Sequence, residues 1–236
     1  MRHKESRKKG DRKKEDTIPS SDFAIEYGVP FFRREIIDLS RPITDGMPTW
    51  PGDVPVRLWR HDELTRIGGI QVGTHAGTHL DAPFHWFADG PTVDQVPLER
   101  LTGPARVVDL RGSGPCITAA ELAAAAGDTE PGERLLLLTG WCGEVTDEDY
   151  PHLSKEAAEL LVACEPALIG IDTPSVDGPH SGQAHGVLLG ADVPILELLV
   201  NLERLVGREF DLFALPLPVV GMDGAPVRAI ARLRAT

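Results

Sequence analysis

Short apolar runs, separated by glycine, proline and polar residues, make up most of the chain beyond residue 33. Runs of Val, Leu and Ile this short are typical of strands that are buried on both faces. On this pattern we expect strands at residues 35–40, 54–59, 106–110, 134–139, 167–172, 210–217 and 226–233. Glycine-rich clusters predict turns at Gly68-Gly69 and at Gly221-Met-Asp-Gly224.

Two segments between these runs carry helix signals. Thr118-Ala-Ala-Glu121 is a capping box, and the Ala-rich sequence after it should end at Gly127. Ser154 can cap a second helix that runs to about Cys164 and stops before Pro166. Helices mixed with strands predict a single α/β domain over residues 33–236, with a mixed sheet as its core and helices on its flanks.

The run 75–85 alternates between polar and apolar residues. Its odd positions hold His75, His79, Asp81 and His85, whereas its even positions are mostly apolar. Alternate side chains share a face in an extended strand, so these four side chains should point the same way. Glycine and proline within the run oppose the alternative, a zinc-binding helix. We therefore expect a strand or extended loop that ends near the proline.

Imidazole and carboxylate groups at this density indicate a metal site. Three of the eight histidines of the chain lie within these eleven residues. Zinc and manganese prefer such nitrogen and oxygen ligands. His75, His79 and Asp81 would supply three ligands with room for water, which is typical of a catalytic site rather than a closed structural one. His85 would be either a fourth ligand or a free base beside the metal.

The second half of the chain offers further ligands. His185 precedes an apolar run, and Glu197 interrupts the apolar stretch 194–199. A buried Glu is rare unless it is paired or binds a cation, and the alternative is a surface helix with Glu197 in solvent. His180 is a competing ligand, although its neighbours predict an exposed loop.

Aromatic side chains near the histidine run could form the wall of a substrate site. Trp86 and Phe87 follow His85 directly. Large aromatic side chains contribute much contact area, either to a ligand or to the core. Packing in the core is the alternative for both, and it is at least as strong for Phe87.

Charge is distributed unevenly along the 236 residues. Residues 1–16 contain eight Lys/Arg and four Asp/Glu, whereas the remainder contains 16 and 32, a net charge of −16. Such an acidic body would repel phosphate, so nucleic acid is not expected as a partner. The basic segment lacks apolar periodicity, and we expect residues 1–32 to form a disordered tail.

The chain shows no sign of a membrane or secreted location. No apolar stretch approaches the ~18 residues that span a bilayer, and the basic start is not followed by the apolar core of a secretion signal. Three widely spaced cysteines, Cys116, Cys142 and Cys164, favour neither a disulfide framework nor a cysteine zinc site. We therefore expect a cytoplasmic protein with no membrane partner.

The histidine run also carries a family resemblance. His75-x-Gly-Thr-His79-x-Asp81-x-Pro-x-His85 resembles the signature of the cyclase family of metal-dependent hydrolases, which includes kynurenine formamidase-like enzymes. Five further stretches look like parts of the same family: Trp50-Pro-Gly-Asp53, Leu138-Thr-Gly-Trp141, Ile171-Asp-Thr-Pro-Ser-Val-Asp177, Ala214-Leu-Pro-Leu and Gly221-x-Asp-Gly-x-Pro-Val-Arg228. The resemblance runs from about Glu35 to Arg234.

The resemblance implies a role for each matching residue. The metal ligands would be His75, His79, Asp81, His185 and Glu197. Asp81 and Glu197 would bridge two divalent ions, either zinc or manganese. His85 would donate and accept a proton, and Trp50 would pack against the substrate. The family also implies a swivelling β/β/α fold and a homodimer or homotetramer.

Such a site predicts hydrolysis. Divalent cations lower the pKa of bound water from about 15.7 toward 7, which would provide hydroxide for attack on an amide or formyl carbonyl. His85 could pass a proton to the departing nitrogen. The resemblance implies a small aryl amide as substrate, first of all N-formyl-L-kynurenine, which would give kynurenine and formate. A cyclic amide such as isatin is the alternative. A non-catalytic metal-binding module is a third hypothesis. His85 argues against it, because the other ligands are sufficient to bind metal without this residue.

Overall fold

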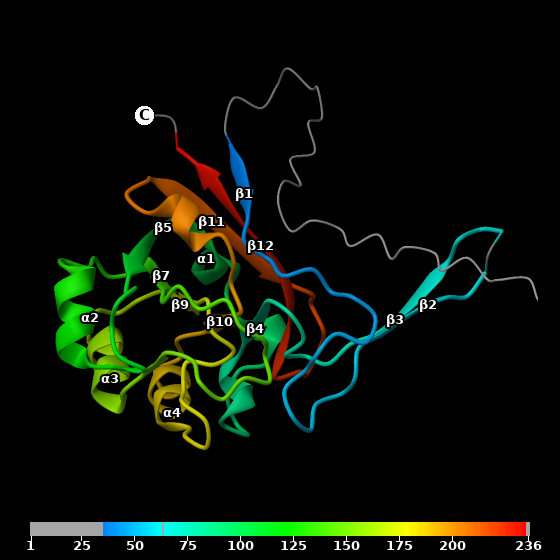
Figure 1. Ribbon diagram of the computed structural model, residues 1–236, viewed down its shortest axis with the longest axis horizontal. Coiled ribbons are helices and arrows are strands. Elements are labelled where there is room, and N and C mark those ends of the chain that lie inside the picture. Colours follow the sequence, from blue (N-terminus) through cyan, green and yellow to red (C-terminus); the bar gives the residue numbers. More distant parts are fainter. Residues whose placement is uncertain (1–34, 63, 235–236) are drawn as a thin grey trace, which may run out of the picture. The chain divides into compact units, whose positions relative to one another are not determined.

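The computed structural model describes residues 35–62 and 64–234. The tail predicted at residues 1–32 lies outside the described residues. The predicted α/β class is confirmed, because a mixed sheet forms the centre and helices pack on it (Figure 1). None of the helices in the described part of the chain has the length and hydropathy that crossing a bilayer requires.

The main sheet closes into a mixed barrel of seven strands. Around the ring the strands are β4 (His79–Asp81), β12 (Gly224–Leu233), β11 (Phe210–Pro216), β5 (Thr102–Asp109), β7 (Arg134–Leu138), β9 (Leu168–Ile171) and β10 (Ile195–Glu197), and β10 pairs with β4 to close it. Neighbours from β5 to β10 are parallel, and the other pairs of the ring are antiparallel. β1 (Ile36–Asp38) pairs with the far half of β12. Closure into a barrel is not visible in the apolar pattern, and the swivelling β/β/α arrangement stays a prediction.

The helices are α1 (Leu98–Leu101), α2 (Ala119–Ala126), α3 (Lys155–Ala163) and α4 (Gln183–Gly190), with short 3-10 turns η1 (Pro83–His85), η2 (Val93–Gln95) and η3 (Leu202–Leu205). Three helices, α2, α3 and α4, pack on the outer face of one side of this barrel, whereas α1 packs beside β5 and β11 and contributes Leu101 to the barrel interior. The predicted capping box is confirmed: the Thr118 hydroxyl accepts from the Glu121 amide, and the Glu121 carboxylate accepts from the Thr118 amide. The Ser154 hydroxyl likewise accepts from the amide of Ala157 at the start of α3.

Two apolar clusters explain why the strand sequences are apolar throughout. One cluster takes side chains from every strand of the ring and so fills the barrel, whereas the other joins the outer face of β5, β7, β9 and β10 to α2, α3 and α4. In β7, Leu136 and Leu138 belong to the inner cluster, and Leu135 and Leu137 belong to the outer one. A strand buried on both faces needs apolar residues at successive positions, which is the pattern of this run.

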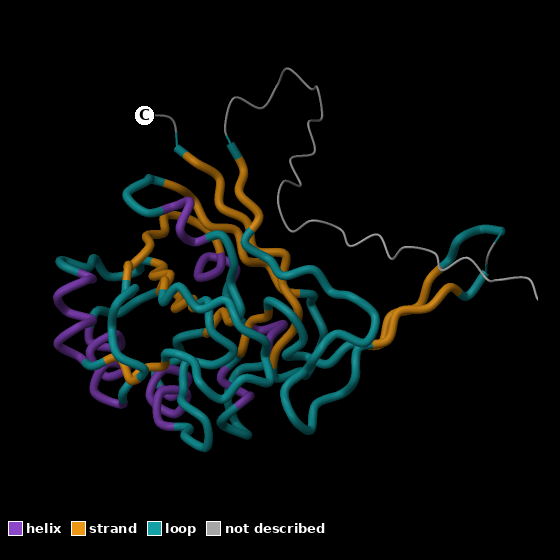
Figure 2. Tube along the Cα trace, viewed as in Figure 1, coloured by secondary structure: helices purple, strands orange, loops and turns teal. Residues whose placement is uncertain are grey.

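Two minor sheets complete the fold. β6 (Cys116–Ile117) pairs with β8 (His152–Leu153), and β2 (Arg57–Arg60) pairs with β3 (Gly68–Gln71) in a hairpin that extends away from the barrel (Figure 2). The turn predicted at Gly68-Gly69 is wrong, because both glycines lie in β3. Gly69 is opposite Trp59, and a Cβ on Gly69 would come within 2.2 Å of the indole. The glycine admits the aromatic ring across the hairpin.

The run 75–83 was expected to be a strand or extended loop with the polar side chains on one face, and its first part is neither. Only β4 is extended and paired, while residues 74–78 form a turn in which Gly77 has a φ of +65°. His85 lies in η1, beyond the strand. The run therefore bends at both ends of β4, so the polar residues converge from three backbone segments rather than along one strand face.

Candidate metal centre

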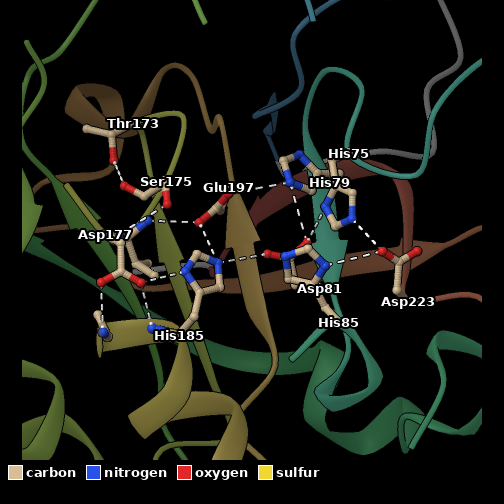
Figure 3. Close-up of polar contacts among 12 residues, drawn as sticks. His75, His79, Asp81, His85, Thr173, Ser175, Asp177, His185, Glu197 and Asp223 are labelled. Carbon is tan, nitrogen blue, oxygen red and sulfur yellow. Dashed lines mark hydrogen bonds and ion pairs between the residues drawn. The ribbon is translucent and has the colours of Figure 1, made fainter. Parts of the chain in front are cut away.

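The structure gathers the six predicted metal-ligand and catalytic residues at one place outside the barrel wall (Figure 3). Leu80 and Leu196 point into the barrel, so the residues beside them in β4 and β10 point outward. In the register of the two strands Glu197 pairs with His79. Four side chains of the group are buried: His79, Asp81, His185 and Glu197. His185 comes from α4, and Glu197 is not on the solvated helix that was its alternative.

Asp81 is at the centre of the group. Its carboxylate oxygens lie 2.9 Å from His75 Nδ1 and 3.4 Å from Nε2 of both His79 and His185. Glu197 faces the same two imidazoles, with its oxygens 3.4 Å from His79 Nε2 and 3.5 Å from His185 Nε2. The two acids therefore share two histidines, an arrangement from which each carboxylate could bridge a pair of ions.

Contacts behind the histidines fix which ring nitrogen faces the acids. His79 Nδ1 lies 2.8 Å from the carbonyl oxygen of Gly77, and His185 Nδ1 lies 2.8 Å from the Asp177 carboxylate. Both partners can only accept, so each Nδ1 carries a hydrogen, and each Nε2 is the nitrogen directed at the acids. Metal-binding histidines are commonly oriented in this way.

Asp177 holds the beginning of α4 as well as His185. Its carboxylate accepts from the amides of Ala184 and His185 at 2.8 and 2.9 Å. The amide of Val176 donates to Glu197 at 2.8 Å. Sequence reasoning did not assign a role to Asp177, although it lies in one of the stretches that resemble the family. The contact between the Asp177 carboxylate and His185 Nδ1 cannot be predicted from the spacing of the two residues in the sequence.

Asp223 is the second functional candidate that sequence reasoning missed. Its Oδ2 lies 2.8 Å from His75 Nε2 and 3.2 Å from His85 Nδ1. Hydrogen bonds from these two imidazoles lower the pKa of Asp223 from its usual value. The sequence placed this residue in a turn, and the turn between β11 and β12 carries it to the histidines.

The carboxylates make this point favourable for positive charge. Burial acts to lower the pKa of His75, but the charge of Asp81 and hydrogen bonds to Asp223 and Asp81 outweigh burial and raise it to about 11. Burial also opposes protonation of His185, whose pKa is nevertheless raised to about 10 by Asp177, Asp81 and Glu197. Conversely, burial acts to raise the pKa of Asp81, and the neighbouring imidazoles hold it well below its usual range. A divalent cation would provide the charge that these acids favour.

The bonding of Asp81 tests whether a cation fits. Both of its oxygens are buried and accept no hydrogen bond of normal geometry, even though the 2.9 Å contact with His75 qualifies as an ion pair. A buried carboxylate without such partners is costly unless it is paired with a cation. The convergent donors are imidazole nitrogens and carboxylate oxygens, which suit zinc or manganese. The residues therefore fit a divalent metal.

A pocket that is open to solvent lies over this group. Aromatic side chains on its wall include Trp50 and Trp86, and the indole of Trp86 stacks on His185 with 5.7 Å between ring centroids. Gly182 lies against the same indole, so close that a Cβ there would come within 2.2 Å of it. Phe87 does not line the pocket and packs beside Gly190 instead. His180 is exposed and outside the group, so it is not a competing ligand.

Comparison with known proteins agrees with this geometry. Residues 37–178 match the family described as "Putative cyclase". The chain belongs to the cyclase family. It is 36% identical over 209 residues to a kynurenine formamidase of Salinibacter ruber (strain DSM 13855 / M31), which covers 84% of this chain and 97% of that protein.

Solved structures share the cyclase-family fold. A structure described as a potential metal-dependent hydrolase with cyclase activity superposes with a TM-score of 0.71 at 28% identity, over 86% of this chain and all of that one. Isatin hydrolase A from Labrenzia aggregata superposes with a TM-score of 0.75 over 86% of this chain and 94% of its own. At 24% identity, the second likeness is one of fold alone.

Replacing Asp81 tests the centre of the cyclase site. We expect Asp81→Asn to purify with little bound zinc or manganese, because it removes the charge that faces three imidazoles. Metal per chain, measured by mass spectrometry of the digested protein, should fall well below the wild-type value. Asp94→Asn, which changes an exposed carboxylate, is the control. Two metals retained by the Asp81 variant would contradict a bridging role.

Proposed function

We propose that this cyclase-family protein is a metal-dependent amidohydrolase of a small aryl amide, with N-formyl-L-kynurenine as the first candidate substrate. The observation that carries the proposal is the convergence of four histidines, Asp81 and Glu197 on one pocket. The kynurenine formamidase relative, which aligns over nearly its whole length, supports the choice of substrate.

The metal ligands we propose are His75, His79, Asp81, His185 and Glu197. Two divalent ions, zinc or manganese, suit five ligands of which two are carboxylates able to bridge. When bound, such ions polarise a carbonyl and lower the pKa of water. The Nδ1 contacts of His79 and His185 keep their Nε2 atoms directed at the acids, so these ligands are oriented before any ion arrives.

His85 is the residue we propose for proton transfer. It lines the pocket and remains partly exposed, and its ring centroid lies 4.3 Å from that of His75 and 5.7 Å from that of His185. An imidazole in such a position can take a proton from the attacking water and return it to the departing nitrogen. This role requires that His85 not be a metal ligand.

The aromatic wall would hold the aryl ring of the substrate. Trp50 and Trp86 line the pocket, and both are partly exposed. Aromatic rings favour offset or edge-to-face contact with one another. Trp86 is already stacked on His185, which leaves Trp50 as the side chain with more freedom to contact a substrate.

Metal analysis followed by turnover on one preparation tests the proposal. N-formyl-L-kynurenine should be hydrolysed, with formate and kynurenine as products, and a chelator should abolish turnover until zinc or manganese is restored. Isatin in parallel measures the cyclic-amide alternative. A protein that binds two metals but hydrolyses neither compound would be a binding module, and the proposal would fail.

Substitution of His85 separates proton transfer from metal binding. We expect His85→Ala to lower kcat about 10²–10⁴-fold, the usual contribution of a general acid or base. Metal content should stay near the wild-type value. His180→Ala, which changes an exposed histidine outside the pocket, should leave both unchanged. Loss of metal from the His85 variant would make this residue a ligand instead.

Substitution of Trp50 tests the aryl site. We expect Trp50→Ala to raise KM for an aromatic substrate roughly tenfold, the equivalent of about 1.4 kcal/mol of contact, with a smaller effect on kcat. Trp50→Phe should keep most of the affinity. Steady-state kinetics of the two variants measure this, and unchanged constants in Trp50→Ala would show that the loop does not face the substrate.

We also propose that the protein is a homo-oligomer, a dimer or tetramer, and that the β2–β3 hairpin contributes to the interface. A two-stranded hairpin by itself is marginally stable in water. Here the hairpin pairs only with itself among the described strands and exposes Trp59, Ile67 and Ile70, of which Ile70 is 71% exposed. In the register of the hairpin Trp59 and Ile70 point to opposite faces, and exposed apolar side chains on both faces favour a contact surface here.

Sedimentation of hairpin variants tests the oligomer. Ile70→Ser should shift the protein toward the monomer, because it removes apolar area from the proposed contact. Leu98→Ser, at an exposed apolar position on α1, should leave the assembly unchanged. A wild-type protein that sediments as a monomer would refute the oligomer, and an unaffected Ile70 variant would place the interface elsewhere.

A further inference from the structure

Asp223 is a partly buried carboxylate. It is neither one of the proposed metal ligands nor the proposed proton-transfer residue. It lies in the turn between β11 and β12, and a single oxygen, Oδ2, faces Nε2 of His75 and Nδ1 of His85 (Figure 3). One atom therefore contacts both a proposed ligand and the proposed proton carrier. The barrel closes through pairing of β4 with β10 and β12, without these side-chain contacts. The position of Asp223 between His75 and His85 therefore suggests a role in the site.

The backbone fixes this turn against the segment that carries His85. The amide of Ala82, just before η1, donates to the carbonyl of Asp223 at 2.9 Å. The amide of Val93 donates to the carbonyl of Met222 at 2.9 Å, and Gly221 donates to the exposed carboxylate of Asp94 at 3.0 Å. The turn is thus attached on both sides of η1, which limits the positions that the Asp223 side chain can take.

Gly224 allows the close approach. A Cβ at this position would come within 2.6 Å of the carbonyl oxygen of Leu80 and 3.5 Å of an Asp81 oxygen. The first distance is too short for any side chain without a shift of the backbone. The glycine that follows Asp223 therefore lets β12 lie directly against β4, and this places the Asp223 carboxylate beside the histidines.

The contacts imply definite tautomers. A carboxylate can only accept, so the nitrogens that face it must carry hydrogen. For neutral His85 this means Nδ1–H, which leaves the lone pair on Nε2. His75 faces a carboxylate with each ring nitrogen, Asp223 with Nε2 and Asp81 with Nδ1 at 2.9 Å, so both nitrogens carry hydrogen unless a cation takes the place of the Nδ1 proton. The contact with Asp223 orients the His75 ring in either case.

We propose that Asp223 is a positioning residue that holds His85 as its Nδ1–H tautomer, so that Nε2 is free to accept the proton in the hydrolytic step, while the same oxygen orients His75 toward the metals. This inference rests on the proposed amidohydrolase function. Asp223 acts through the two imidazoles and binds neither substrate nor metal.

Kinetics and metal content of the zinc-loaded protein test the role. Asp223→Ala should lower kcat about 10–100-fold, the usual effect of losing a residue that supports a metal-site histidine, with KM unchanged. Two zinc ions per chain should remain at saturating zinc. Zinc lost from the variant would make Asp223 a ligand, and unchanged kcat would make it dispensable; either result overturns the inference.

Asp94→Ala is the matched control. It removes the contact that anchors Gly221 in the same turn and leaves the contacts to the histidines in place. We expect a much smaller fall in kcat than in Asp223→Ala. Equal losses in the two variants would show that anchoring of the turn matters rather than the carboxylate, and the inference would be wrong.

Nitrogen NMR of the histidine rings gives a readout that does not depend on turnover. The zinc-loaded wild type should show His85 protonated at Nδ1, with its signal assigned by its absence from His85→Gln. In Asp223→Ala, protonation should move toward Nε2. If the alanine variant does not fold, Asp223→Asn provides the same comparison at constant size, because its amide can also donate and should weaken the preference. An unchanged tautomer in the folded variant overturns the inference, even if the wild type hydrolyses no aryl amide and the proposed function fails.

Discussion

Asp81 ends a three-residue strand that is paired on both sides, and its side chain is almost completely buried. A buried charge without hydrogen bonds must be compensated by positive charge close by. The surroundings of Asp81 meet this requirement with imidazoles from the turn before β4, from β4 itself and from α4. The fit of the site to a divalent cation depends on this one carboxylate, which is buried and accepts no hydrogen bond of normal geometry.

In two strands of the barrel, apolar core residues alternate with polar residues of the site. In β4, Leu80 belongs to the apolar interior, whereas His79 and Asp81 point outward to the polar group. The same alternation in β10 sets Leu196 against Glu197. Ligands carried by paired strands are positioned precisely, because moving one would disturb the barrel interior. The loops then supply carboxylates that contact the histidines from behind, Asp177 at His185 and Asp223 at His75 and His85.

Local signals in the sequence were sufficient to predict part of the secondary structure. The capping box at Thr118 and the Ser154 cap predicted two helices correctly, because capping depends on residues three apart along the chain. The Leu-rich run at 135–138 predicted a buried strand for a similar reason. The Gly68-Gly69 turn was wrong because the glycines serve a cross-strand contact with Trp59, and pairing between strands is not a local property.

Membership of the cyclase family could be read from the amino-acid sequence, because the spacing of His75, His79, Asp81 and His85 and the family stretches around it are local patterns. The burial of Glu197 opposite His79 and the contacts of Asp223 with two histidines became visible in the folded protein. Those contacts join residues more than a hundred positions apart. They depend on how strands are ordered around the barrel, and no local pattern of residues encodes that order.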